Sequence, residues 1–455
     1  MSNPTFVRAA MALALAIATD SRAASDADLA EIREQIRQLK SSYEARINAL
    51  EQKLNEAEAA KKAAPVAETR AAPATGTASG GSAFNPAISA VLQGAYGNLK
   101  QDPGSFRISG VALANDLESP KRGFSLAESE LTLAASVDDK FAAVLTFSLT
   151  PDNTVAVEEA YAVATAVPYG IVPKFGRFFS GIGYLNEQHQ HNWDFYDAPL
   201  VYQAYLGGQY TNDGLQVKWG APTDLFLEFG AEAGSGEGFP GTGRNKNGIG
   251  NGTAYVHAGG DVGASNSWRA GLSYLQTSAV NREYNQADLA GNEARLGFSG
   301  RSKLAIADFV WKWAPNGNAR EQNFKLQGEY FWRREKGDLT YDADGALGLT
   351  QSGDYASNQR GYYVQGIYQF MPMWRIGLRY DELRPGGTRY GANDAVLGDE
   401  GFNPKRATAM IDWTPSEFSR FRLQFAQAKL VPGITDNQFF AQYILTLGAH
   451  GAHRY

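Results

Sequence analysis

Two histidine pairs have the spacing that most readily suggests metal chemistry. His189 and His191 are two residues apart, so on an extended chain both imidazoles share one face and could chelate zinc or copper. His450 and His453 are three residues apart, which on a strand sends the two rings to opposite faces. We expect His189 and His191 to be a polar pair in an extracellular loop rather than a metal site, and we expect no cofactor.

Cationic side chains in the second half of the chain form another group that could do chemistry, because they alternate with apolar residues. On a strand, this alternation puts the cations on one face and the apolar residues on the other. If the apolar face meets lipid, the cations line an aqueous interior, since charge on the lipid face is strongly destabilising. The expected pore-lining residues are Arg269, Lys312, Lys325, Arg333, Arg375, Arg379, Arg406, Arg420 and Arg422.

Acidic residues leave two interpretations of that inner face open. Guanidinium groups on a channel wall favour the entry of anions. Alternatively, mixed charges keep the interior wet and pair with one another across adjacent strands. The acidic residues expected on the same face are Asp308, Glu329, Asp381 and Asp412. Four more on earlier strands would make one wall acidic, namely Glu128, Glu130, Glu158 and Glu159.

Motifs of the common enzyme classes are missing from the sequence. There is no nucleophile elbow, no His-Glu-x-x-His pair and no P-loop, and the glycine-rich stretches 241–243 and 248–252 have no strand-to-helix context. The lack of cysteine excludes thiol nucleophiles, disulfides and Cys-ligated zinc. The net charge of −6 gives no reason to bind nucleic acid. We therefore expect no enzyme, although a triad scattered over strands would escape this reasoning.

The elements that must position these residues are strands, because residues 84–455 repeat with period two. Phe421, Leu423 and Phe425, for example, alternate with charged or amide side chains. No run approaches 18 apolar residues, which excludes helical membrane spans. The aromatic content of 12% excludes disorder for most of the chain.

Three features favour a membrane barrel over a soluble sandwich. Aromatic residues crowd the ends of the alternating segments, as girdles do, with Trp311, Trp313, Tyr362 and Tyr363 among them. Tight connections alternate with long polar ones, which we place at 234–252, 280–300 and 384–404. The alternation also continues to the aromatic last residue. At roughly 20 to 25 residues per strand with its loop, the length predicts roughly 16 strands and a lumen that water enters.

The first 83 residues have a different character. Residues 1–23 read as a signal peptide, with Arg8 before a short apolar run and small residues before the cleavage site. Residues 24–60 carry a heptad seam of Leu and Ile that predicts a coiled-coil helix and leans towards three strands. A solvated amphipathic helix is the alternative. Residues 61–83 are rich in Ala, Pro, Gly and Thr and predict a flexible linker.

Several short motifs resemble the phosphate-selective porin O and P family. They are Asn85-Pro86-Ala87-Ile88, Glu158-Glu159-Ala160-Tyr161 and Lys174-Phe175-Gly176-Arg177-Phe178-Phe179. The resemblance implies a 16-stranded trimeric outer-membrane channel, which in some members follows a periplasmic coiled coil. The basic arrays on inward-folded loops that give that family its phosphate specificity cannot be placed here residue by residue.

The sequence thus predicts an all-β transmembrane antiparallel barrel preceded by a short periplasmic coiled-coil helix. We expect a homotrimeric porin in the bacterial outer membrane, surrounded by lipid, that passes small polar or anionic solutes by diffusion. The alternative is a structural protein that tethers the outer membrane through its coiled coil. No nucleic-acid partner is expected.

Overall fold

The computed structural model describes residues 86–115, 117, 120–150, 154–399 and 401–448. The predicted signal peptide, coiled coil and linker lie outside these residues, as do His450 and His453. Among the helices of the described residues, none is long and apolar enough to cross a membrane.

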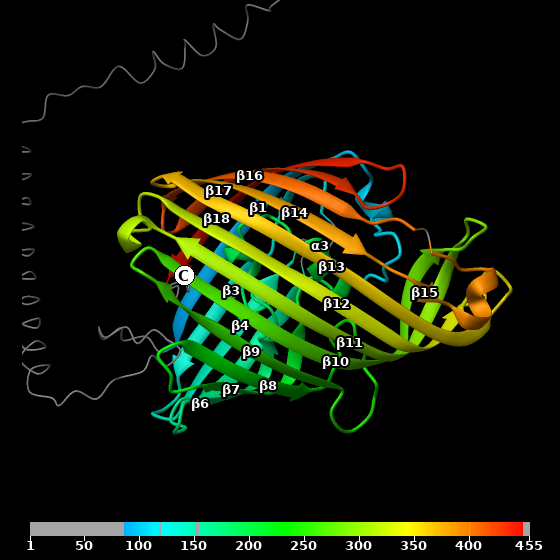
Figure 1. Cartoon of the computed structure of the whole chain (residues 1–455), viewed down its shortest axis with the longest axis horizontal. Coiled ribbons are helices and arrows are strands. Elements are labelled where there is room, and N and C mark those ends of the chain that lie inside the picture. The colour runs from blue at the N-terminus through cyan, green and yellow to red at the C-terminus, as the bar shows by residue number, and fades with distance from the viewer. Residues whose placement is uncertain (1–85, 116, 118–119, 151–153, 400, 449–455) are drawn as a thin grey trace, which may run out of the picture. The chain divides into compact units, whose positions relative to one another are not determined.

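Antiparallel strands make up most of the described chain (Figure 1). The first group is β1 (Ala87–Leu99), β2 (Gly123–Leu126), β3 (Ser129–Ser136), β4 (Phe141–Leu149), β5 (Val155–Ala164), β6 (Ile171–Phe179), β7 (Thr211–Gly220), β8 (Phe226–Gly234) and β9 (Asn251–Val262). The second group is β10 (Asn266–Ala287), β11 (Glu293–Trp313), β12 (Asn323–Tyr341), β13 (Gln351–Met371), β14 (Trp374–Arg384), β15 (Thr388–Arg389), β16 (Lys405–Ser416), β17 (Ser419–Lys429) and β18 (Asp436–Gly448).

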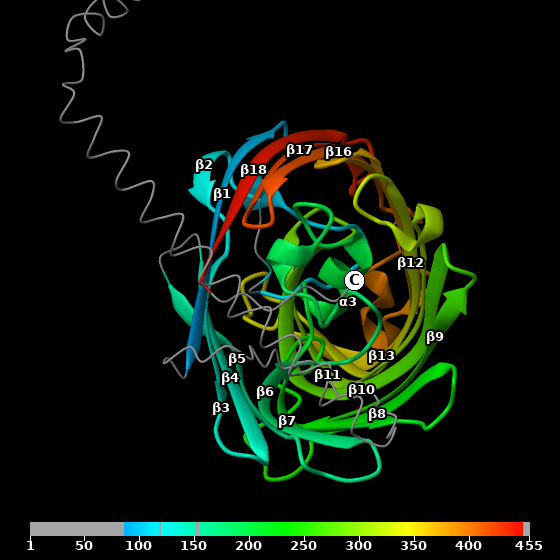
Figure 2. The ribbon, with the colours of Figure 1, turned by 90° about the vertical axis from the view of Figure 1, so that its left-hand side faces the viewer.

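The sheet closes on itself because β1 pairs with both β18 and β3. The short strand β2 pairs with the stretch of β1 that β3 leaves free, and β15 follows β14 along β13. These two pieces therefore add no position to the ring. Within the described residues the barrel has 16 strands, which confirms the predicted all-β antiparallel barrel and its strand number. Figure 2 shows the closed ring seen from one end.

Side chains alternate between the two faces of the barrel as predicted. On β17, Phe421, Leu423 and Phe425 are 45–50% exposed, whereas Arg422 and Gln424 between them are 1–2% exposed. An exterior of this kind suits hydrocarbon, because a cation on the lipid face costs about 2–4 kcal/mol at the bilayer midplane. The expected girdle residue Tyr363 is an exception, since it is 1% exposed and packs inside the barrel.

Four strands, β10 to β13, are 19–22 residues long and extend beyond their neighbours. The prediction of a long loop at 280–300 was wrong, because β10 and β11 continue through it and leave a turn at 288–292. A bulge between Ala279 and Arg282 shifts the register, with Asn281 at φ 49°. Apolar side chains including Phe298, Leu339 and Tyr355 pack under this extension.

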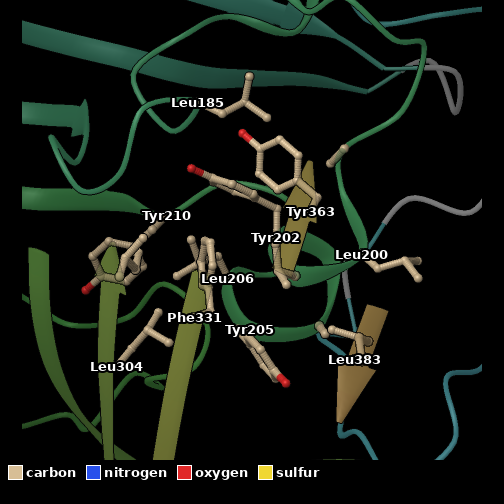
Figure 3. Close-up of a cluster of buried hydrophobic side chains, with 14 of the residues drawn as sticks. Leu185, Leu200, Tyr202, Tyr205, Leu206, Tyr210, Leu304, Phe331, Tyr363 and Leu383 are labelled. Atoms are coloured by element: carbon tan, nitrogen blue, oxygen red, sulfur yellow. The ribbon is translucent and has the colours of Figure 1, made fainter. Parts of the chain in front are cut away.

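Helical turns occupy the connections. They are η1 (Pro103–Ser105), η2 (Gln190–Asn192), α3 (Leu200–Leu206), η3 (Pro315–Gly317) and η4 (Gly391–Ala395). The connection 180–210, which we call the inner segment, runs from β6 to β7 and folds inside the barrel with η2 and α3 (Figure 2). All seven residues of α3 are buried, and Tyr202 and Tyr205 pack against Phe331 of β12 (Figure 3).

Candidate functional site

The inner segment contacts the barrel wall on several sides, so it controls what space is left in the lumen. Near its start, Ser180 and the Gly181 amide donate hydrogen bonds to Glu232 of β8 at 2.6 and 2.8 Å. On the other side, the Leu185 amide donates to Glu329 of β12 at 3.1 Å. Buried backbone donors need such partners, and carboxylates of the wall supply them.

The wall also caps the helix of the inner segment. Pro199 precedes α3 and offers no capping side chain, but the Leu200 amide donates to Asp381 Oδ1 of β14 at 2.8 Å. A carboxylate at a helix N-terminus is also favoured by the helix dipole. At the other end the helix stops at Gly207, whose φ of 67° is left-handed and costs glycine little. The position of α3 is therefore set by β14 as much as by its own sequence.

Asp194 of the inner segment joins two of the predicted pore-lining cations. It forms ion pairs with Lys325 of β12 and with Arg375 of β14, the latter at 3.2 Å. Burial disfavours the ionised carboxyl, but the two cations outweigh it and hold the pKa of Asp194 below its usual range. Asp194 is thus a charged anchor inside the lumen.

Asp197 joins two more of the predicted cations. Arg379 Nη2 donates to Asp197 Oδ1 at 2.8 Å, and Arg406 of β16 pairs with the other oxygen. Gln424 of β17 donates to the same carboxylate at 2.9 Å. Burial again opposes ionisation, and the two guanidinium groups again prevail, so the pKa of Asp197 is lowered.

Three further arginines hold backbone carbonyls of the inner segment. Arg422 Nη2 donates to the Trp193 carbonyl at 2.8 Å and Arg420 Nη1 to that of His191 at 3.3 Å. Arg333 donates to the Ala204 carbonyl at 3.1 Å and lies over the Tyr205 ring at 4.6 Å. These guanidinium groups act as hydrogen-bond donors to a buried loop.

The structure therefore brings together most of the predicted pore-lining cations, but around a partner that the sequence did not indicate. Arg269 also reaches the segment, with Nη2 3.5 Å from the Gly183 carbonyl and the guanidinium over the Tyr184 ring. Lys312 is half-buried on β11, and among the described residues no contact ties it to the inner segment. The acidic residues expected on the inner face, Asp308, Glu329, Asp381 and Asp412, are all buried.

His189 and His191 do not lie in an external loop, which corrects the prediction. They belong to the inner segment, and η2 bends the chain between them. His191 Nδ1 lies 2.8 Å from Glu130 of β3, and His189 lies beside Glu130, Glu158 and Glu159. These three glutamates therefore form part of the acidic wall that the sequence predicted, and the two histidines face it.

Comparisons with known proteins place the chain in a family without assigning it an activity. No family model matches the sequence. An uncharacterized protein of Aquifex aeolicus (strain VF5) is 31% identical over 399 residues, covering 82% of this chain and 80% of the relative.

Solved structures with a similar outline have low sequence identity. OmpT of Vibrio cholerae in its trimer form is 12% identical with a TM-score of 0.48, covering 79% of this chain and 98% of that one. The anion-selective porin of Comamonas acidovorans is 9% identical with a TM-score of 0.46, covering 79% and 98%. Each score is below 0.5, so neither similarity assigns an activity.

Proposed function

This chain belongs to the same family as the uncharacterized Aquifex aeolicus protein, and we propose that it is an outer-membrane porin. The observation that carries the proposal is the closed ring with an apolar outside and a polar inside. Exposed Leu378, Phe425 and Leu423 match hydrocarbon, and closure leaves no unpaired strand edge in the bilayer. Closed barrels of this kind span bacterial outer membranes.

Passive diffusion of small polar solutes follows from the width of the ring. A barrel of about 16 strands is too wide for wall side chains to fill. The inner segment takes up part of the lumen, so we propose that solutes pass through the part that it leaves open.

We also propose a preference for anions, but it depends on fewer cationic residues than the sequence predicted. Cations that are already bound to Asp194 and Asp197 present little field to a passing solute, because each carboxylate neutralises its neighbours. Among the described residues, Lys312 is the predicted cation that has no contact to the inner segment. The resemblance to phosphate-selective porins rests on the sequence motifs alone.

A homotrimer is also proposed, supported by the outward face of β5. Ala160, Ala162 and Ala164 give that face a smooth surface, on which another copy can pack closely. The alternative role, a tether that acts through residues 24–60, has no supporting observation among the described residues. Export, the periplasmic coiled coil and the linker remain sequence-based proposals.

Conductance in planar lipid bilayers tests the proposal. The full chain, extracted in detergent, is expected to insert in triplet steps and to remain open at low voltage. A protein that inserts and never conducts would overturn the porin proposal. Deleting residues 24–62 separates the alternative, since a porin still conducts without them, whereas a tether loses its function.

A further inference from the structure

The cluster around His189 contains more buried negative charge than its histidines explain. The side chains of Glu130, Glu158 and Glu159 are 2%, 9% and 9% exposed. Their ion-pair partners among the described residues are His189 and His191. No Lys or Arg of the described residues forms an ion pair with any of the three carboxylates. Buried carboxylates without cations are costly, so the cluster calls for a positive ion.

A bulge in β5 creates this concentration of charge. Thr146 of β4 pairs with Glu159 and Phe147 pairs with Val157, so Glu158 is an extra residue without a partner. Residues 158 and 159 would otherwise point to opposite faces of the strand. The bulge turns both carboxylates towards His189, and bulges commonly re-aim side chains in this way.

The two ring nitrogens of His189 have different surroundings. Nε2 lies 3.0 Å from Glu159 Oε2, and Glu159 is itself held by the Phe179 amide at 3.3 Å. Nδ1 lies 3.0 Å from Glu130 Oε2 and 3.3 Å from Glu158 Oε2, yet neither Nδ1 nor Glu158 Oε2 has a hydrogen-bond partner. If Nε2–H donates to Glu159, the lone pair of Nδ1 faces two carboxylates, and either a proton or a metal ion must lie between them.

We propose that Glu130, Glu158, His189 and His191 bind one divalent transition-metal ion, with zinc as the best match. Zinc binds imidazole nitrogens and carboxylate oxygens and is almost always tetrahedral in structural sites, so these four ligands can complete its coordination. In such a site, ligand atoms lie about 3.3 Å apart for bonds of about 2.0 Å. The Glu130, His189 and His191 donor atoms already lie within 4.8 Å of one another, so small side-chain movements complete the site.

Glu159 is a positioning residue in this site. It accepts the Nε2 proton of His189, which fixes the tautomer and aims Nδ1 at the metal. The metal would join β3 and β5 to the inner segment. This inference does not depend on the porin proposal, because a metal can bind here whether or not the barrel conducts.

Titration of the metal-free full chain in detergent with Zn²⁺ or Co²⁺ tests the site. We expect one ion per chain and, for Co²⁺, the visible absorption of a tetrahedral complex. His191→Ala and Glu130→Gln should each weaken Zn²⁺ binding at least 100-fold. Glu159→Gln should weaken it about 10- to 100-fold, as changes to the partner of a liganding histidine do.

A matched control distinguishes this site from general histidine binding. His257 of β9 is also buried beside a carboxylate, with Nδ1 3.2 Å from Glu228 Oε1, but it lies outside the cluster. His257→Gln should keep full Zn²⁺ affinity. Heat modifiability on gels shows which variants form a barrel, and the Co²⁺ spectrum of the wild-type chain requires no variant at all.

Two results would overturn the inference. Without stoichiometric binding to the folded wild-type chain, the cation between the carboxylates is a proton on His189. Binding that survives both His191→Ala and Glu130→Gln would mean that the metal lies elsewhere.

Discussion

Arg379 of β14 donates a hydrogen bond of 2.8 Å to Asp197 of the inner segment, although the two residues are 182 positions apart in the sequence. The same arginine also contacts Asp381 of its own strand at 3.1 Å. The guanidinium group thus joins the barrel wall to the segment that lies inside the lumen. Contacts of this kind decide how far the inner segment can move.

Removing the carboxylate of Asp197 should loosen the inner segment. Asp197→Ala leaves Arg379 and Arg406 without that counter-charge, and breaking a buried ion pair costs about 3–5 kcal/mol. We expect a lower midpoint in urea and a larger, noisier single-channel conductance. Asp224→Ala, in an exposed turn, is the matched control and should change neither. Unchanged conductance in Asp197→Ala would mean that the segment does not limit flow.

Acid should release the inner segment only at very low pH. The pKa values of Asp194 and Asp197 are depressed because Lys325, Arg375, Arg379 and Arg406 outweigh the effect of burial. Stabilisation by a depressed carboxyl is present above its unfolded pKa of about 3.9 and is lost as pH falls through the folded value. Protection of the amides of residues 180–210 from hydrogen exchange, relative to the unfolded chain at the same pH, should therefore stay constant from pH 7 to about 4 and fall below that. A release midpoint near pH 6 would point to a histidine instead.

Ion selectivity should depend more on Lys312 than on the arginines bound to the inner segment. Lys312→Gln removes a cation without breaking a contact to that segment, so the reversal potential in a salt gradient should shift towards cations. Lys246→Gln, in the exposed 235–250 loop, controls for surface charge and should have a smaller effect. Equal shifts of the reversal potential in the two variants would mean that Lys312 does not line the pore.

Outward-facing residues should tolerate charge only outside the bilayer. Leu378, in the middle of β14, is 68% exposed, and Leu378→Arg should destabilise the lipid-inserted barrel by about 2–4 kcal/mol. Ile249, in the 235–250 connection, is 69% exposed, and Ile249→Arg should be close to neutral. Urea titrations in lipid vesicles compare the two variants. Equal stability would mean that β14 does not face hydrocarbon.

The ring of strands could be predicted because period two is a local signal. Arg422 and Gln424 alternate with phenylalanine and leucine, and this alone places them inside. The extension of β10 and β11 through 280–300 was missed, since its glycines and asparagines resemble those of a loop. Tyr363 was assigned to a girdle because type alone does not tell which face an aromatic residue occupies.

The inner segment could not be predicted, because its contacts are long-range. Nothing local to Asp194 or Asp197 indicates that arginines far along the chain will pair with them. The predicted cations were therefore expected to face water in the lumen, whereas most of them bind the inner segment. The bulge at Glu158 is equally invisible, since an extra residue is recognised only against the partner strand.

The bulge in β5 also links the number of residues in that strand to the number of carboxylates beside His189. A relative that lacks the extra residue, Glu158, would restore a regular ladder between β4 and β5 and would have one carboxylate fewer beside His189. A deletion at this point would therefore remove the bulge and one ligand of the proposed metal site in a single step.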